Sequence, residues 1–347
     1  MKLAIHKRPG SFSDRWIPYC EDNNIPFKIV NCYDSDIIEQ LKDCDGLMWH
    51  WSQGDYRAQN FARQMIISVE KMGIKVFPNS SNCWHFDDKL GQKYLLEAIN
   101  APLVPSYAFY DKKTALEWVS KTSFPKVFKL RGGAGSINVK LVKNKRYAKK
   151  LIQRSFGRGF AFASRHDGLK DRFWCLKRDK NFKAIVHVIK GFARLLLPPV
   201  GSTLLHRQKG YVYFQEFIPH NEYDDRIVIV GQKAFALRRK NRKNDFRASG
   251  SGLISYDKDQ FPKKAIQIAF RTSQKLKTQS LAFDFIYDKE QNPFIVEISY
   301  AYVMGDAYDK CPGYWDEQLN WHPDSVNPQR YIIKDFIDKL EKDANKT

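Results

Sequence analysis

Two acidic residues, Asp284 and Glu297, are spaced so that a hairpin would set them opposite each other. The stretch 281–300 has two arms rich in aromatic and β-branched residues, and the polar residues 289–292 between them predict a four-residue turn. That turn sets the strand register so that Asp284 lies directly across from Glu297 on one face. The two Cβ atoms would then be roughly 5 Å apart.

A pair of carboxylates at this distance needs a compensating charge. Like charges in opposed positions destabilise a strand pair, and a hard divalent cation or a shared proton removes the repulsion. The sequence therefore indicates a Mg²⁺ site at Asp284 and Glu297. The alternative is a register shifted by two residues, in which each acid pairs with a Lys or Arg side chain.

The chain is strongly basic, and its positive charge is concentrated. The formal net charge is +20, and residues 143–209 hold 18 Lys and Arg against 3 Asp, a net charge of +15. A smaller basic cluster follows at 238–243 and Arg247. Such a field favours a polyanionic partner: nucleic acid, an acidic glycan or an anionic membrane surface. The alternative is a solvated basic face that only aids solubility.

Length and composition indicate a globular protein of two or three lobes. The 347 residues can bury a large core, and no apolar run reaches the roughly 18 residues needed to span a bilayer. The first ten residues contain no apolar signal core, so we expect a cytoplasmic location. No two of the 6 cysteines are spaced as C-x-x-C, which argues against a zinc or redox motif and for reduced structural thiols.

The first 79 residues alternate short apolar runs with helical stretches, which predicts a small parallel α/β lobe. The expected elements are strands at 2–6, 27–30, 46–51 and 75–77 and a helix at 57–71. The third strand runs into the Trp- and His-containing segment 49–54, at the edge of the sheet where ligands usually bind. This segment is either a substrate loop or a group of packed aromatics.

A second lobe begins with an acid-led amphipathic helix at 87–99. A strand at 124–130 then enters the glycine-rich loop 131–139, which matches neither a P-loop nor a Rossmann turn. Bare backbone N–H groups in such a loop can bind phosphate, although a simple glycine hairpin is the alternative. Lys129 favours phosphate, because it places a compact positive charge just before the loop.

A third candidate element is the apolar strand 211–218, which carries Gln215 and Glu216 near its end. A turn and the strand 225–231 follow it. A polar pair that closes a buried strand can receive the edge of a purine base. The same pair could equally form an edge-strand salt bridge.

In this order, the segments resemble the ATP-grasp carboxylate–amine ligases, the group containing glutathione synthetase, D-alanine:D-alanine ligase and the ribosomal-protein glutamate ligases. The resemblance covers about residues 80–300. It is carried by Asp88-Lys89, Pro125 to Lys129, the loop 132–139, Gln215 to Ile218, Asp225-Arg226, Arg239, Asp245 to Arg247, Asp284 and Glu297.

The resemblance implies an α/β (α+β) ATP-grasp fold in three parts. Residues 1–83 would form a parallel α/β domain. Residues 84–214 would form a central lid subdomain with the glycine loop, in which about residues 143–210 are a basic insertion. Residues 215–347 would form a C-terminal subdomain whose antiparallel sheet carries the metal site.

The resemblance also implies ATP and Mg²⁺ as cofactors and a role for each site residue. The residues implied to bind ATP are Lys89 and Lys129 at the phosphates, Gly133, Gly135 and Ser136 in the closing loop, Gln215, Glu216 and Ile218 at adenine, and Asp225 or Asp224 at the ribose. The implied catalytic residues are Arg226, Arg239 and Arg247, which would neutralise the acceptor carboxylate or the phosphoryl group. The implied metal ligands are Asp284, Glu297 and Ser299.

Two features depart from the family pattern. The metal motif usually ends Glu-x-Asn, whereas this chain has Glu297-Ile298-Ser299, and a hydroxyl is a weaker Mg²⁺ ligand than an amide oxygen. About eighty residues separate the glycine loop from Gln215, roughly twice the expected number. The surplus is the basic segment, so we expect it to recognise substrate.

The function implied is ATP-dependent amide formation through an acyl phosphate. The tail 311–322 resembles that of ATP-grasp proteins encoded with bacterial surface-polysaccharide genes, and its aromatic rings would either stack on sugars or cap a core. We therefore expect an amino acid or small amine to be joined to a hexuronic acid. Expected partners are that amine, an acidic saccharide or lipid-linked glycan acceptor and the anionic inner membrane face, and not nucleic acid. The alternatives are an amino-acid ligase acting on a peptide or protein tail and a non-catalytic nucleotide- or polyanion-binding protein.

Overall fold

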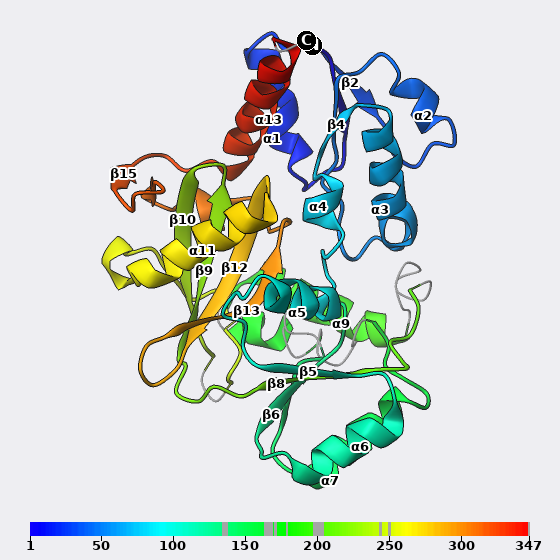
Figure 1. Ribbon diagram of the computed structural model, residues 1–347, viewed down its shortest axis with the longest axis vertical. Helices are drawn as coiled ribbons and strands as arrows, with labels where there is room; N and C mark the ends of the chain where they lie inside the picture. The colour runs from blue at the N-terminus through cyan, green and yellow to red at the C-terminus, as the bar shows by residue number, and fades with distance from the viewer. Residues whose placement is uncertain are drawn as a thin grey trace.

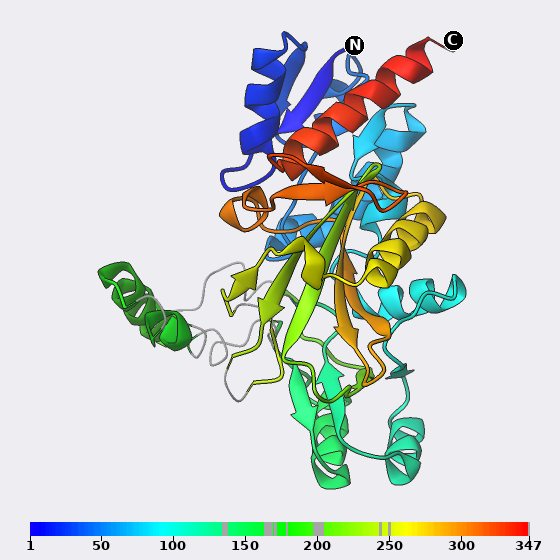
Figure 2. The same cartoon turned by 90° about the vertical axis from the view of Figure 1, so that its left-hand side faces the viewer.

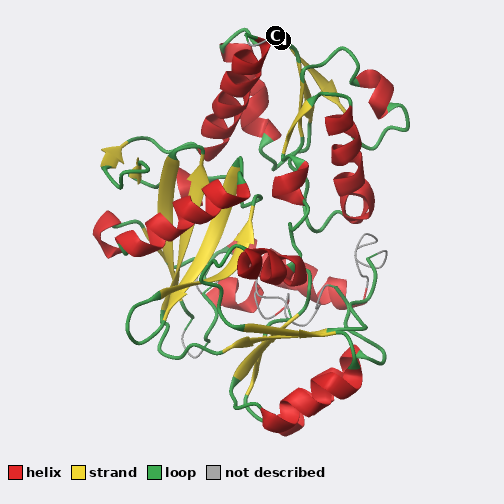
Figure 3. Ribbon diagram, in the orientation of Figure 1, coloured by secondary structure: helices red, strands yellow, loops and turns green. Residues whose placement is uncertain are grey.

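The computed structural model describes residues 1–133, 138–162, 169, 172–177, 180–196, 205–242, 245–248 and 251–345. Three sheets with helices against them make up this part of the chain (Figure 1, Figure 3). One sheet is parallel and two are antiparallel. The predicted α/β fold class is therefore confirmed.

The first sheet is parallel, as the sequence predicts, and its strand order is β2-β1-β3-β4. Its strands are β1 (Leu3–His6), β2 (Phe27–Val30), β3 (Gly46–Met48) and β4 (Lys75–Phe77). The helices of this lobe are α1 (Ser13–Asp22), α2 (Ile37–Gln40), α3 (Tyr56–Lys71) and α4 (Ser80–Cys83). Buried residues recur along one face of α3 at positions 58, 62, 65, 66 and 69, because that face covers the core.

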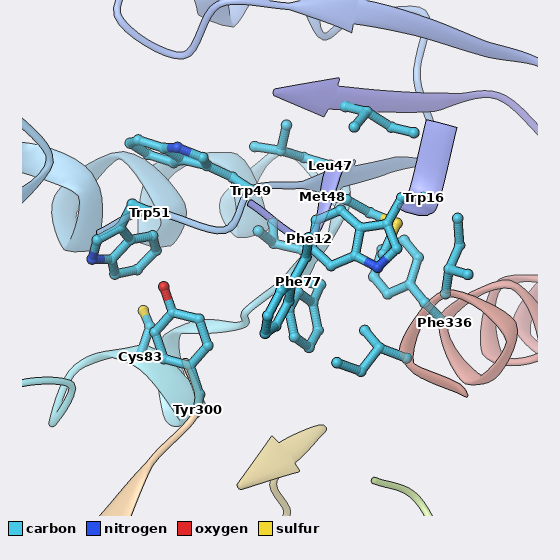
Figure 4. Close-up of a cluster of buried hydrophobic side chains, with 14 of the residues drawn as sticks. Phe12, Trp16, Leu47, Met48, Trp49, Trp51, Phe77, Cys83, Tyr300 and Phe336 are labelled. Carbon is cyan, nitrogen blue, oxygen red and sulfur yellow. The ribbon is translucent and has the colours of Figure 1, made fainter. Parts of the chain in front are cut away.

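The last helix, α13 (Pro328–Ala344), returns to this first lobe and lies beside α1 (Figure 1). Phe336 of α13 belongs to the same buried cluster as Trp16, Leu47 and Phe77 (Figure 4). The indole Nε1 of Trp16 also donates a hydrogen bond to the backbone oxygen of Gln329, at 3.1 Å. Residues more than 300 positions apart thus share one core.

Strand β3 ends at Met48, so the predicted strand 46–51 is too long. Trp49 and Trp51, which follow it, are almost completely buried in the aromatic cluster. His50, Trp51 and Ser52 also line the cavity described below. The segment therefore both packs the core and faces the cavity.

The second sheet is antiparallel with the order β5-β8-β6-β7. Its strands are β5 (Ser106–Phe109), β6 (Lys126–Lys129), β7 (Lys140–Val142) and β8 (Val212–Glu216). Helices α6 (Lys112–Lys121) and α7 (Lys145–Ser155) pack on it through a separate buried cluster. Helix α5 (Lys89–Ala98) precedes this sheet.

The third sheet is also antiparallel, with the order β13-β12-β9-β10-β14-β15 and β11 paired with β10. Its strands are β9 (Tyr223–Val230), β10 (Lys233–Lys240), β11 (Ile254–Ser255), β12 (Ser280–Tyr287), β13 (Pro293–Ser299), β14 (Gly313–Trp315) and β15 (Trp321–Pro323). The accompanying helices are η1 (Lys258–Gln260), α11 (Lys263–Leu276) and α12 (Asp306–Asp309). Val228 and Val230 of β9 enter the first core and Ile227 and Ile229 enter the core under α11, as strand alternation requires.

The β12–β13 hairpin pairs Asp284 with Glu297, as predicted, although its loop length and its register near the loop differ from the prediction. Tyr287 pairs with Pro293, so the loop is one residue longer than the predicted four-residue turn. A β-bulge between Asp284 and Phe285 then shifts the register by one residue. The two deviations cancel at the carboxylate pair.

The tail 311–322 caps a core and does not line the cavity. Trp315 is buried in the core under α11, and its ring lies 4.6 Å from that of Trp321. The ring of Tyr314 stacks on that of His322, and Lys233 Nζ lies over the Tyr314 ring, 3.5 Å from its centre. Of the two interpretations of these aromatics, the structure supports core packing.

Part of the basic segment 143–209 is described, including α7 and α9 (Phe182–Leu196). Helix α9 stands well apart from the sheets in the view of Figure 2 (dark green). Among the described residues, no helix is long and apolar enough to cross a membrane.

Candidate active site

A cavity of about 690 Å³ is lined by strand residues of the second and third sheets and by loop residues of the first lobe. It gathers most of the residues that the sequence singles out, although they are dispersed from position 89 to position 299. Those that line it are Lys89, Lys129, Gly133, Gln215, Glu216, Ile218, Arg226, Arg239, Arg247, Asp284, Glu297 and Ser299. Gly135 and Ser136 lie outside the described residues.

Lys89 is the first residue of α5, where the Asp88 carboxylate caps the helix by accepting the Gly91 N–H at 2.9 Å. Its buried Nζ donates to the Gly133 carbonyl oxygen at 2.9 Å and to Glu297 Oε1 at 3.0 Å. Burial by itself would lower the pKa of Lys89, but the neighbouring carboxylates outweigh it and hold the pKa above its usual value. Lys89 is therefore a fixed positive charge in the cavity wall.

Lys129 ends strand β6 and is equally buried, but among the described residues its Nζ has neither a hydrogen bond nor an ion pair. The pKa of Lys129 is lowered to about 8: burial lowers it most, Glu297 partly offsets this shift, and the charge on Lys89 adds to the lowering. A buried ammonium without a partner is unfavourable. An anion in the cavity would relieve this cost.

The glycine loop is tied to α5 through Asp87, a residue that sequence reasoning did not select. Its Oδ1 accepts the Gly133 N–H at 2.7 Å, and burial raises its pKa to about 6. A Cβ at Gly132 would lie 2.9 Å from Asp87 Oδ2 and 2.9 Å from Phe162 Cε2, so a larger residue there would displace these side chains. Asp87 also lines the cavity, and its position beside Asp88-Lys89 was the available sequence signal.

Gln215 and Glu216 close strand β8 and line another part of the cavity. The Glu216 carboxylate accepts from Lys126 Nζ at 2.9 Å and from the Tyr107 hydroxyl at 3.0 Å. The salt-bridge interpretation of this pair is therefore correct for the Glu216 side chain. Gln215, Phe217 and Ile218 of this segment line the cavity as well.

Asp284 is held by two arginines. Arg226 forms a fork to it, with Nε–Oδ1 at 2.6 Å and Nη2–Oδ2 at 2.7 Å, and Arg239 Nη2 lies 3.0 Å from Oδ2. Arg239 forms a second fork to Asp224, with both distances at 2.6 Å. Burial by itself would raise the pKa of Asp284, but the two guanidinium groups hold it well below its usual range.

Asp225 does not line the cavity, which corrects its assignment to a cofactor. Strand alternation turns it to the opposite face of β9, where its completely buried carboxylate accepts from Arg238 at 2.7 and 2.8 Å and from the Tyr287 hydroxyl at 2.5 Å. Asp224, the other residue considered for the same role, does line the cavity.

The carboxylates of Asp284 and Glu297 each have a basic partner, although the register is not shifted as the alternative interpretation required. No cluster of three or more His, Cys, Asp or Glu residues able to hold a metal occurs in the described ranges. Mg²⁺ commonly binds through one or two carboxylates completed by phosphate and water. Asp284 and Glu297 fit that form of binding. Ser299 lies two residues after Glu297 in the sequence, and its hydroxyl donates to the Ala301 carbonyl oxygen at 2.6 Å.

Further residues line the cavity: His50, from the segment 49–54 that the sequence indicated as a possible substrate loop, and Arg8 and Tyr308, which the sequence did not single out. Arg8 and His50 line the cavity from the first lobe. Tyr308 also lines it, and its hydroxyl accepts a hydrogen bond from Arg226 Nη1 at 3.4 Å. His50 is buried, stacks on the ring of Phe12 and has a pKa lowered by burial to about 3, so it is neutral. No local motif marks Arg8 or Tyr308, because the fold alone brings them to the cavity.

The arrangement of the three sheets, with the cavity lined by the second and third of them, is the ATP-grasp fold. No protein-family model matches the chain, and no curated protein matches it. Solved structures do. The D-cycloserine synthetase DcsG matches 98% of this chain over 100% of its own length, with a TM-score of 0.60 and 10% identity.

Two further similar structures support the same fold. A RimK domain ATP-grasp protein from Sphaerobacter thermophilus covers 86% of this chain and 90% of its own, with a TM-score of 0.52 and 12% identity. The D-alanine–D-alanine ligase from Bacillus anthracis, solved with ATP, covers 86% of both chains, with a TM-score of 0.51 and 13% identity. At such identities the similarity establishes the fold, and activity has to be argued from the residues.

Proposed function

We propose that the protein is an ATP-dependent carboxylate–amine ligase, which forms an amide and releases ADP and phosphate. The observation that carries the proposal is the buried, unpaired ammonium of Lys129 in the same cavity as the Asp284–Glu297 pair. A cation without a counter-charge favours phosphate, and two opposed carboxylates favour Mg²⁺. Similar structures of known activity include ligases.

Each group then has a role in phosphoryl transfer. Lys129 and Lys89 would hold the phosphates, together with backbone N–H groups of the glycine loop, in which we also place Gly135 and Ser136. Asp284 and Glu297 would hold Mg²⁺, which when bound spreads the charge of the phosphate oxygens. Ser299 is a third candidate ligand.

The arginines would bind the acceptor. Arg226 and Arg239 lie beside Asp284 and can neutralise a carboxylate substrate or the transferring phosphoryl group. Arg247 lines the same cavity and forms a fork with Asp245, with Nε–Oδ1 at 2.9 Å and Nη2–Oδ2 at 2.7 Å, so it is held in place there. Asp224 takes the ribose role in place of Asp225. The Gln215–Ile218 segment would contact adenine.

For the substrates, we infer that an amino acid or small amine is joined to a hexuronic acid in an acidic, lipid-linked glycan. The support is the basic segment 143–209, whose charge suits a polyanionic acceptor at a cytoplasmic membrane face. The aromatic tail adds no support, because its rings pack in a core.

The test is ADP release from Mg²⁺-ATP with a panel of amino acids, uronic acids and acidic peptides. Wild type should release ADP only when an amine and a carboxylate are both present. Glu297→Ala should lose at least about a hundredfold of that rate, because it removes a metal ligand and the partner of Lys89. Glu290→Ala is the matched control, because Glu290 lies in the exposed turn of the same hairpin and its ion pair is with the adjacent Lys289.

The outcomes separate the candidate functions. Turnover with peptides and not with uronates would make the protein a peptide or protein-tail ligase. ATP binding that no acceptor converts to turnover would favour the non-catalytic nucleotide-binding interpretation. Failure to bind ATP with Mg²⁺ present would contradict the proposal.

A further inference from the structure

Helix α9 presents an apolar stripe to solvent. Phe182, Ile185, Ile189 and Phe192 are all exposed, with Phe182 at 79% and Ile189 at 62% of their full accessibility. Their spacing of three, four and three residues places them within an arc of about 80° on the helix surface. Exposed large apolar side chains gathered on one stripe are typical of a surface that binds a partner.

The exposed stripe is not the surface through which α9 packs on the rest of the chain, because other residues of the helix make that contact. Val188 and Gly191 are buried, and a Cβ at Gly191 would lie 2.8 Å from Leu169 Cδ1. Phe173, on the segment 172–177 that also packs there, contacts Phe192 edge-to-face at 5.8 Å and is itself exposed. The exposed stripe therefore widens onto a second segment.

The charge of this region indicates what the stripe binds. The 15 residues of α9 include Lys183, Lys190 and Arg194 and no acidic residue, and the surrounding segment 143–209 carries a net charge of +15. Lys190 and His187 are exposed on the part of the helix beside the stripe. A basic amphipathic helix with Phe and Ile on its apolar face is the pattern of helices that lie in the interface of anionic bilayers.

The helix is linked to the cavity. The Trp174 indole, on the segment 172–177, donates to the Ser251 carbonyl at 3.1 Å, and Arg242 lies over its ring at 5.2 Å. Residues 246–248 between these two positions line the cavity. Any surface to which α9 binds would therefore lie close to the opening of the cavity.

We propose that α9 docks the protein on an anionic lipid bilayer, with Phe182, Ile185, Ile189 and Phe192 inserted among the lipids. The apolar stripe supplies insertion, and the basic residues supply attraction to acidic headgroups. Docking would bring a lipid-carried acceptor to the cavity. That last consequence rests on the proposed function, but the docking itself does not.

The experiment is co-sedimentation of the full chain with vesicles of phosphatidylcholine alone or mixed with phosphatidylglycerol, without ATP or acceptor. Wild type should bind the anionic vesicles. Ile189→Glu and Phe182→Ser should each weaken the binding at least about tenfold, because each removes an inserted side chain. Ile67→Glu is the matched control: Ile67 is an exposed isoleucine on α3, in the first lobe, and its change should leave binding as in wild type.

The proposal fails if wild type sediments with neither kind of vesicle, or if both stripe variants bind as wild type does. It also fails if the chain self-associates without lipid and Ile189→Glu abolishes that association, since the stripe would then bind a second copy. As a control for folding, the variants should unfold at the same thermal midpoint as wild type. Binding of Mg²⁺-ATP should be unchanged in the stripe variants, so a failure of docking can be distinguished from a failure of the nucleotide site.

Discussion

Glu297 faces the cavity beside Asp284 because a β-bulge precedes it in strand β13. Strict alternation from Ile295, which is buried in the core under α11, would place Glu297 in the same core. The bulge instead puts both Val296 and Glu297 on the cavity side and returns Ile298 to the core. One extra residue thus decides whether the carboxylate is available for chemistry.

Metal binding should respond to the residue at position 299. Replacing Ser299 with asparagine would restore the amide oxygen of the family pattern and release the contact to the Ala301 carbonyl. We expect Ser299→Asn to lower the Mg²⁺ concentration needed for half-maximal nucleotide binding by severalfold, and Ser299→Ala to raise it. Titration of Mg²⁺ at fixed nucleotide measures this, and identical curves for all three proteins would exclude Ser299 as a ligand.

Nucleotide affinity should depend on the protonation of Lys129. Its pKa of about 8 means that the free protein loses the ammonium charge as the pH rises through that value, so affinity for ATP should fall above about pH 8. Lys129→Met should bind at least about tenfold more weakly at neutral pH and show no such fall. Isothermal titration at several pH values tests this, and a parallel fall in both proteins would assign the titration to another group.

The same lowered pKa predicts the opposite trend for stability. The folded pKa of Lys129 lies below that of an ordinary lysine, so between about pH 8 and about pH 10.4 the unfolded chain holds more protons. This group therefore makes the free energy of unfolding rise with pH in that range. Urea unfolding of wild type and Lys129→Met across the range should show that slope in wild type alone.

Two adjacent acids should behave differently when neutralised. Asp225→Asn should lower the free energy of unfolding by about 3 kcal/mol, because it leaves Arg238 without its buried partner, and should not change the Kd for nucleotide. Asp224→Asn should weaken nucleotide binding, because Asp224 faces the cavity. Calorimetry and urea unfolding measure both effects, and a change in Kd for Asp225→Asn would contradict its placement.

Asp87 should make stability fall with rising pH. Its folded pKa, about 6, is above its usual value, so the folded chain holds more protons between about pH 4 and about pH 6, and this contribution to stability is lost as pH rises through that window. Asp87→Asn should reduce the fall by about 2 kcal/mol. Urea unfolding across the window tests this. Asp111→Asn, at an exposed cap of α6, is the control and should not reduce it.

Local sequence patterns determined the elements and much of the candidate site. Alternating aromatic and β-branched residues indicated the β12–β13 hairpin and with it Glu297, and apolar runs indicated the parallel first sheet. The glycine loop indicated Lys129, whereas Lys89 was implied only by the family resemblance. These features depend on backbone preferences and side-chain periodicity within a few residues, which a sequence shows directly.

The tertiary structure alone decided the contacts between distant segments. Lys89 meets Glu297 across 208 positions, and α13 returns to pack on the first lobe. Asp224 lines the cavity and Asp225 does not, because of the face that β9 turns to the cavity. The bulge in β13 places Glu297 on the cavity side. Both are set by long-range burial, which no local pattern encodes.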